Sequence, residues 1–353
     1  TVFNRRNAIN ELEDRFLIWN MVTDDGVRAL FIPQELDSTQ SAASTETERP
    51  KPVSLVGQNI PFRPPAPLAW DLLVLLQRWF GPLATAQTDP FAPSAESAAE
   101  LNAMLWNRGD IRPPVGYVEL LIEFAVGLKL LVEPQDGDSQ FERSDEIREW
   151  RVRTWEEQAN RIRRIWMASQ FWIDGQTRQD VEPWSVDWRG FRIKLLNHLA
   201  TLERDTWYRT EDVGNWIADY DPGILGAGAT VALSHAGTTE PRNEHARGVA
   251  HVVRITIDGV LHWLGLAQVV SPRTGEAFVR FGDELSRIVR AEPSPNDIAG
   301  HRTRIEIADD LTIRVVNPEP ILVWSILAFA ETVSLGAESV FRITTSRLRS
   351  ATA

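Results

Sequence analysis

Two segments with helical periodicity, followed by two short β-prone runs, constrain the fold of this chain more than any other feature. After Thr210, a candidate N-cap, the apolar residues of the first segment recur at helical spacing: Val213, Trp216, Ile217 and Tyr220. The second segment, from Ala246 to Leu264, repeats this period, and Gly265 follows it where a left-handed C-cap would lie. The pattern therefore predicts two consecutive amphipathic helices.

The β-prone runs come directly after the second predicted helix. Leu266 to Val270 and Ala277 to Phe281 flank the turn sequence Ser271-Pro272-Arg273-Thr274-Gly275. Helices followed by a two-stranded wing are typical of a winged-helix unit, a relative of the helix-turn-helix. Such a unit either reads DNA or docks on another protein, so the pattern predicts an architecture and leaves the function open.

Length and composition narrow the class of protein. A chain of 353 residues favours two or three domains, each large enough to bury its own core. No apolar run approaches the roughly 18–20 residues of a membrane span, so we expect no membrane partner. The chain contains no cysteine, and Thr1 is not followed by a basic and apolar leader, which favours a cytoplasmic location.

The net charge of −12 is distributed unevenly along the chain. Residues 1–240 hold 24 Lys and Arg against 36 Asp and Glu, whereas residues 241–353 hold 13 of each. Surfaces that contact DNA phosphates usually carry a basic excess. The neutral C-terminal third, which includes the second helix and the wing, is therefore the better candidate for nucleic-acid binding.

The whole chain is predicted to be mainly α with small β-hairpins, of the α+β class, with tandem winged-helix units before a small α+β module. Changes in composition and periodicity divide it into six segments. The first three are a partial winged-helix-like helix and hairpin (1–36), a flexible Ser/Thr/Pro-rich linker (37–67) and a winged helix (68–142). The last three are a helical connector (143–206), a winged helix with a loop insertion at 221–245 (207–295) and the α+β module (301–353). An independent helical hairpin is the alternative for the first segment.

Helices are expected in most of these segments, and their limits can be stated: 7–22, 68–80, 94–106, 115–126, 143–172, 188–202, 320–330 and 344–350. Strands are expected at 27–32, 128–132, 304–308, 311–316 and 339–343. The predicted wing after 128–132 carries Asp136 and Asp138 at its tip, which favours packing against protein over contact with phosphates.

The residue patterns of the common enzyme classes are missing from the sequence. None of the three lysines follows a glycine, as a P-loop requires, and there is neither a His-Glu-x-x-His motif nor a Gly-x-Ser-x-Gly elbow. Gly226-Ala227-Gly228 lacks the third glycine of a dinucleotide fingerprint. We therefore expect a protein that is not an enzyme, with no catalytic, metal-binding or cofactor-binding residues.

The fourteen tryptophans raise the question of base stacking. Six of them lie beside aliphatic residues at helical spacing, which favours core packing: Trp70, Trp79, Trp106, Trp166, Trp216 and Trp324. Trp184 and Trp188 are the two expected to be partly exposed at a helix entry.

Several stretches resemble a bacterial family of helicase-associated proteins that carry a domain similar to the N-terminal domain of XPB-type helicases. The resemblance rests on the stretches Trp207-Tyr208-Arg209-Thr210-Glu211-Asp212-Val213, Leu261-His262-Trp263-Leu264-Gly265, Ala277-Phe278-Val279-Arg280-Phe281 and Phe329-Ala330-Glu331-Thr332-Val333. It covers residues 150–353 well and residues 1–150 loosely, and its motifs are mostly packing residues. It implies tandem winged helices without a motor domain, and it carries over no catalytic residue.

These observations favour a non-enzymatic winged-helix adaptor in DNA repair or transcription, with a helicase or another DNA-processing subunit as partner and duplex DNA as a further ligand. The candidate nucleic-acid-binding residues are Arg273 at the wing tip and three arginines around the second helix, Arg242, Arg247 and Arg254. The alternative is a sequence-specific transcriptional regulator, which would act as a dimer on two half-sites. A third class, an enzyme with an unfamiliar site, would require acids with shifted pKa values gathered in a pocket.

Overall fold

The structure of the chain is a computed structural model. The protein combines α-helices with small antiparallel sheets, so its fold belongs to the α+β class. The residues that it describes are 19–22, 28–31, 48–55, 66–80, 105, 117–132, 142–170, 186–226, 241–271, 276–290, 303–334 and 338–345. They form two compact units, each assembled from segments that lie far apart in the sequence. Unit 1 comprises residues 1–53, 170–255 and 279–294, and unit 2 comprises 54–169, 256–278 and 295–353.

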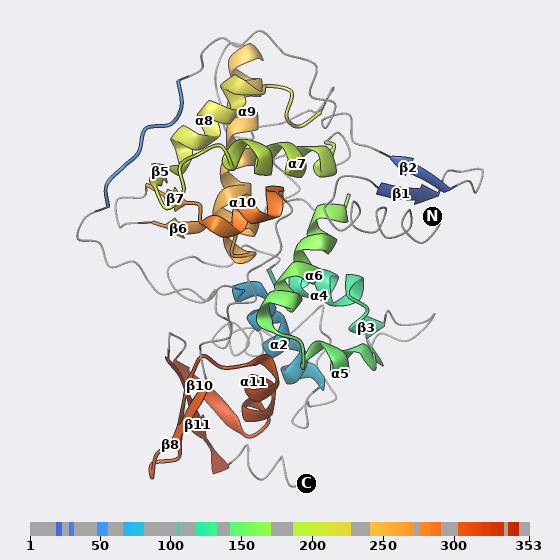
Figure 1. Cartoon of the computed structure of the whole chain (residues 1–353), viewed down its shortest axis with the longest axis vertical. Helices are drawn as coiled ribbons and strands as arrows, with labels where there is room; N and C mark the ends of the chain where they lie inside the picture. Colours follow the sequence, from blue (N-terminus) through green and yellow to red (C-terminus); the bar gives the residue numbers. More distant parts are fainter. Residues whose placement is uncertain are drawn as a thin grey trace, which may run out of the picture. The chain divides into compact units, whose positions relative to one another are not determined.

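Unit 1 contains four helices among its described residues, and all four are seen in Figure 1: α7 (Trp188–Leu199), α8 (Thr210–Tyr220), α9 (Pro241–Thr256) and α10 (Asp283–Arg290). The short strand β5 (Trp207–Arg209) leads into α8, and β1 (Trp19–Val22) pairs with β2 (Arg28–Phe31) as a hairpin. Near its C-terminal end α9 passes into a π-helical turn, η3 (Ile257–Leu261). The division between the units falls at the end of α9 and again within β7 (Phe278–Arg280), a strand of the sheet β5-β7-β6.

The helical part of unit 2 is built from α2 (Pro67–Phe80), α4 (Tyr117–Gly127), α5 (Glu146–Trp150) and α6 (Trp155–Ala168). The short strands β3 (Leu131–Val132) and β4 (Glu142–Arg143) pair antiparallel. The indole of Trp70 stacks on that of Trp155, with 5.3 Å between ring centroids. The buried Tyr117 donates a hydrogen bond of 2.7 Å to the buried carboxyl group of Asp71, which ties α4 to α2.

A Schellman motif ends the η3 helix in unit 2. Gly265 adopts φ of +73°, its N–H donates to the carbonyl of His262, and the N–H of Leu266 donates to the carbonyl of Leu261. The buried guanidinium of Arg163 donates a hydrogen bond of 3.2 Å to the carbonyl of Leu264, so a cation lies at the negative end of the helix. The predicted left-handed C-cap at Gly265 is confirmed. The strand β6 (Gln268–Val270) follows this motif directly.

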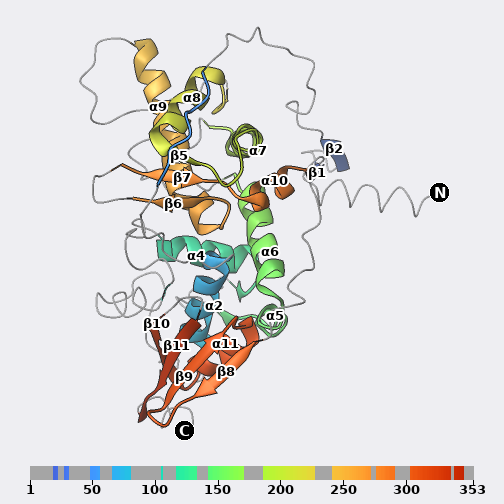
Figure 2. The same cartoon turned by 60° about the vertical axis from the view of Figure 1, so that its left-hand side comes forward.

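The C-terminal part of unit 2 is a four-stranded antiparallel sheet of order β10-β11-β9-β8, with α11 (Pro320–Leu327) lying against it in both views (Figures 1 and 2). Its strands are β8 (Arg304–Ile307), β9 (Thr312–Val316), β10 (Ala330–Ser334) and β11 (Glu338–Ile343). Two side chains of neighbouring elements donate to backbone carbonyls near α11: Gln77 to Trp324, at 3.0 Å, and Trp155 to Pro318, at 2.7 Å. The sheet and the helices α2 and α6 therefore share one unit.

The structure corrects several predicted elements. Residues 330–334 form β10, a strand that the sequence did not predict and whose first residue had been placed at the end of a helix, so the module runs β-β-α-β-β. The predicted helix 143–172 is broken into α5 and α6, because Thr154 and Glu157 form a capping box that starts a new helix. Residues 19–22 are a strand paired with β2, whereas the sequence placed them at the end of a helix.

Other predictions concern residues outside the described part of the chain. They include most of the helix predicted at 7–22, the helix at 94–106, the acidic wing tip with Asp136 and Asp138, and nearly all of the helix at 344–350. The predicted burial of Trp79 and Trp106 and the predicted exposure of Trp184 also concern side chains outside the described part of the structure. Within the described residues, no helix combines the length and the apolar character needed to cross a membrane.

Candidate nucleic-acid interface

Residues Thr210–Tyr220 form α8 because most of their apolar side chains recur on one helical face. Val213, Trp216 and Ile217 are buried, as the helical spacing predicted, whereas Tyr220, the fourth residue of the predicted face, is 53% exposed. Glu211 and Asp212 are exposed in the first turn, where negative charge interacts favourably with the helix dipole. The N-cap residue is Arg209, so the prediction of Thr210 as N-cap was wrong: Thr210 is the first helical residue and is fully buried.

Gly214 allows α8 and α9 to approach each other closely. A Cβ atom at this position would lie 2.8 Å from the carbonyl oxygen of Ala250 in α9. Contacts under 3.0 Å are essentially never made by real Cβ atoms, so only glycine fits this helix crossing. Val249, Val252 and Val253 of α9 are fully buried. The helix begins at Pro241, which shortens the predicted loop insertion 221–245 from its C-terminal side.

The opposite face of α9 carries basic side chains. Arg247 is exposed, and Arg254 and His251 are half-buried. The spacing of these three residues, i, i+4 and i+7, places them in one row along the helix. The guanidinium of Arg254 lies 3.2 Å from Nδ1 of His251. We refer to Arg247, His251 and Arg254 as the α9 row.

The structure thus brings two of the four predicted binding residues, Arg247 and Arg254, onto one helix face. The backbone of Arg242 lies in the first turn of α9, but its side chain is outside the described part of the structure. Arg273 lies between β6 and β7 in the sequence, outside the described residues. His251 was not among the predicted binding residues, although its position four residues after Arg247 and three before Arg254 would have indicated it.

A side-chain hydrogen bond connects α7 to the C-terminal end of α8. Nε2 of His198 lies 3.2 Å from the carboxylate of Asp221, and the imidazole contacts the ring of Tyr220 with 5.2 Å between centroids. Burial raises the pKa of Asp221, but the hydrogen bond from His198 and the charge of Lys194 outweigh this effect and hold the pKa below its ordinary value. The carboxylate form of Asp221 is therefore favoured, and its contact with His198 links α7 to α8.

Part of the predicted linker packs on unit 1. The N–H of Val53 donates to the carbonyl of Trp207 at 2.7 Å, and the guanidinium of Arg49 lies 3.4 Å from the carbonyl of Thr201. The indole of Trp207 also meets the guanidinium of Arg280, 5.0 Å from the ring centroid. Residues 48–53 therefore make backbone and side-chain contacts within unit 1, in a stretch that the sequence assigned to the linker.

Two further results bear on the chemistry of the chain. In the described ranges, no three His, Asp or Glu side chains come together in a way that could hold a metal ion. Trp188 is buried, with 2% of its surface exposed, so the prediction that it is partly exposed was wrong. Four tryptophans predicted to pack in the core are confirmed as buried: Trp70, Trp166, Trp216 and Trp324.

No family model matches the sequence of the chain, and no curated protein matches it. The class defined by the fold and the site is an α+β protein with a basic row on an exposed helix face.

Proposed function

We propose that the protein is a non-enzymatic winged-helix adaptor in DNA transactions, which docks on a helicase or a similar DNA-processing subunit and binds duplex DNA through α9. The observation that carries this proposal is the combination of a tightly crossed helix pair with the α9 row on its exposed face. In helix-turn-helix proteins and their relatives, the second helix of such a pair contacts DNA.

The charges along the two helices support this assignment. The first turn of α8 is acidic, with Glu211 and Asp212, whereas the α9 row supplies two arginines. An arginine guanidinium binds phosphate with paired, charge-assisted hydrogen bonds. DNA would therefore contact α9 and avoid the N-terminal end of α8. The strongly acidic remainder of the chain disfavours extended DNA contact and leaves the other surfaces for protein partners.

The salt dependence of DNA binding tests this proposal. Neutralising Arg247, Arg254 and Arg273 together by alanine should weaken binding to a duplex and reduce the slope of log K against log salt by up to about 3 units. Fluorescence anisotropy with a labelled duplex at several salt concentrations measures both effects.

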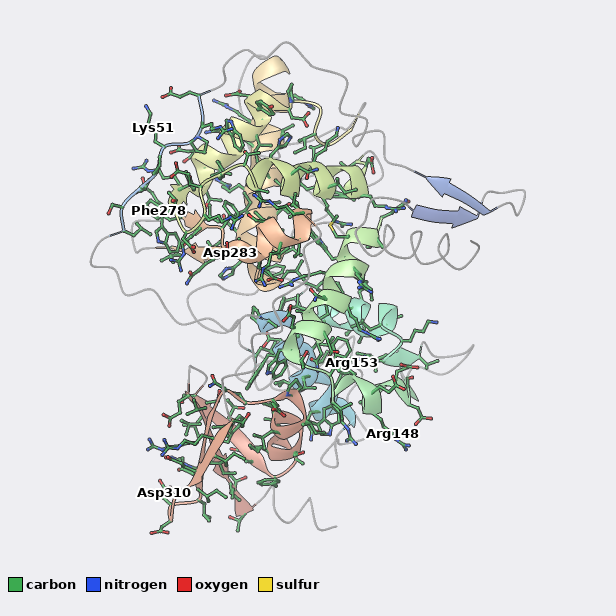
Figure 3. The ribbon with its side chains drawn as sticks, in the orientation of Figure 1. Lys51, Arg148, Arg153, Phe278, Asp283 and Asp310 are labelled. Carbon is green, nitrogen blue, oxygen red and sulfur yellow. The ribbon has the colours of Figure 1, made fainter. Side chains whose placement is uncertain are left out.

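A matched variant controls for the loss of three positive charges. Arg148, Arg153 and Arg314 lie in unit 2, and each makes an ion pair; Figure 3 labels Arg148 and Arg153. Their combined replacement by alanine should leave the slope unchanged. Equal slopes for the wild type and the Arg247, Arg254 and Arg273 variant would refute DNA binding through α9.

The docking of a protein partner is tested by affinity capture from the native cell extract, with and without nuclease. An adaptor retains its helicase or related subunit after the nucleic acid has been digested. Loss of every captured protein on nuclease treatment would contradict the adaptor proposal and would favour a protein that meets its neighbours only through DNA.

A further inference from the structure

The edge strand β8 of the C-terminal sheet exposes apolar side chains. Ile305 is 48% exposed and Ile307 is 69% exposed. The strand register sets Ile305 opposite Val315 and Ile307 opposite Ile313, and both of these partners on β9 are buried. Cross-strand partners share one face of a sheet, so the core-forming face continues onto β8. There its apolar side chains are open to solvent.

The free edge of β8 also presents backbone hydrogen-bonding groups. The N–H of Ala308 donates to the carbonyl of Thr312 on β9, at 2.9 Å. Because successive residues of a strand direct their N–H and C=O groups to opposite sides, Glu306 and Arg304 also face β9. The groups of Thr303, Ile305 and Ile307 consequently face the open edge. No other strand of the described residues pairs with this edge, as the strand order and Figure 2 show.

The charges of β8 match those of a second copy in one register. In an antiparallel pair centred on Ile305, Arg304 lies opposite Glu306 of the second copy, and Glu306 lies opposite its Arg304. Both side chains are largely exposed and already form an ion pair within the strand. Centring the pair on Glu306 would set two carboxylates opposite each other, and centring it on Arg304 would set two guanidinium groups opposite each other.

The backbone favours the same register. Ile305 directs its N–H and C=O groups outward, so an Ile305–Ile305 pair exchanges two hydrogen bonds, and the two Ile307–Thr303 pairs exchange four more. The Arg–Glu positions then become non-hydrogen-bonded pairs, in which the side chains approach most closely. Ile305 of each copy would cover that of the other on the apolar face.

We propose that β8 pairs antiparallel with β8 of a second copy, about a two-fold axis at Ile305, and that the chain forms a homodimer through this edge. The two sheets then join into one, with both copies of α11 on the same face. The proposal goes beyond the DNA-binding function, because it concerns only the C-terminal sheet. Pairing along one short strand buries a small area, so the dimer is expected to be weak and to depend on concentration.

Charge reversal tests the proposed register. Sedimentation of the wild-type chain over a range of concentrations should give an average mass that rises from 39.9 kDa towards twice that value. Arg304→Glu alone and Glu306→Arg alone each turn two attractive cross-strand pairs into repulsive ones. Each should raise the dimer dissociation constant at least about fivefold.

Mixing the two variants should restore dimers, since every Glu–Glu pair and every Arg–Arg pair becomes a Glu–Arg pair in the mixed species. The double variant Arg304→Glu/Glu306→Arg should also recover the wild-type constant. Arg342→Glu on the central strand β11 changes the net charge as much as Arg304→Glu does and should leave the constant unchanged. Circular dichroism confirms that each variant is folded.

Two results would overturn the proposal. One is a wild-type chain that stays monomeric at all concentrations, which would leave the edge to a different partner. The other is a dimer whose dissociation constant is unaffected by either single reversal, or that fails to form mixed dimers, since this would place the contact elsewhere on the chain.

Discussion

Replacing Gly214 by alanine distinguishes a close helix crossing from a pair of helices that merely lie near each other. An alanine in the middle of a helix is ordinarily more stable than a glycine by about 0.8–1 kcal/mol. Here the added methyl group would lie 2.8 Å from a backbone oxygen of α9, so the helices must separate. Overpacking of this kind costs about 1–3 kcal/mol. The expected net effect is a destabilisation of about 1 kcal/mol.

Thermal unfolding followed by circular dichroism measures this difference. For a unit of this size, about 1 kcal/mol lowers the melting temperature by roughly 2–4 °C. Gly282→Ala is the control, because nothing lies within 4 Å of a Cβ at that position, and its effect should stay within about 0.5 kcal/mol. If Gly214→Ala raises the melting temperature by several degrees, the helix propensity alone decides and the crossing is not close.

Three further predictions concern polar groups that act within one unit or the other. Asp221 has a lowered pKa, so its contribution to stability is present above the unfolded-state pKa of about 4 and is lost as the pH falls through the folded-state value. In thermal melts, the difference in stability between the wild type and Asp221→Asn should therefore disappear below about pH 4. A difference that does not change with pH would contradict the role given to His198. Thr154→Ala removes the cap of α6 and should cost about 1 kcal/mol in denaturant titrations, whereas an unchanged midpoint would show that the capping box is not needed. Tyr117→Phe takes a hydrogen bond away from the buried Asp71 and should cost about 1–3 kcal/mol, and equal stability would show that another group satisfies the carboxyl.

Periodicity was sufficient to predict most of the helices. The start of α8 was predicted to within one residue, because its buried apolar residues recur at helical spacing. The hairpin of β8 and β9 was found in the same way, since apolar and charged residues alternate along Arg304–Ile307. These elements depend on interactions between residues close in sequence.

Elements that depend on distant partners were missed. β10 has no period-two pattern that separates it from the end of α11, and its pairing with β11 decides its structure. Nothing local indicates that Val53 pairs with Trp207, because 154 positions separate them in the chain and a proline directly precedes Val53. Gly214 also looks unremarkable in the sequence, and only the position of Ala250 gives it a role.

The central claim, that the exposed face of α9 is the binding surface, is tested most directly by photocrosslinking. A photoreactive side chain at position 247 in α9 should crosslink to bound duplex DNA. The same group at position 152, where Val152 is 64% exposed in unit 2, should not. Crosslinks from position 152 with none from position 247 would contradict the assignment of α9.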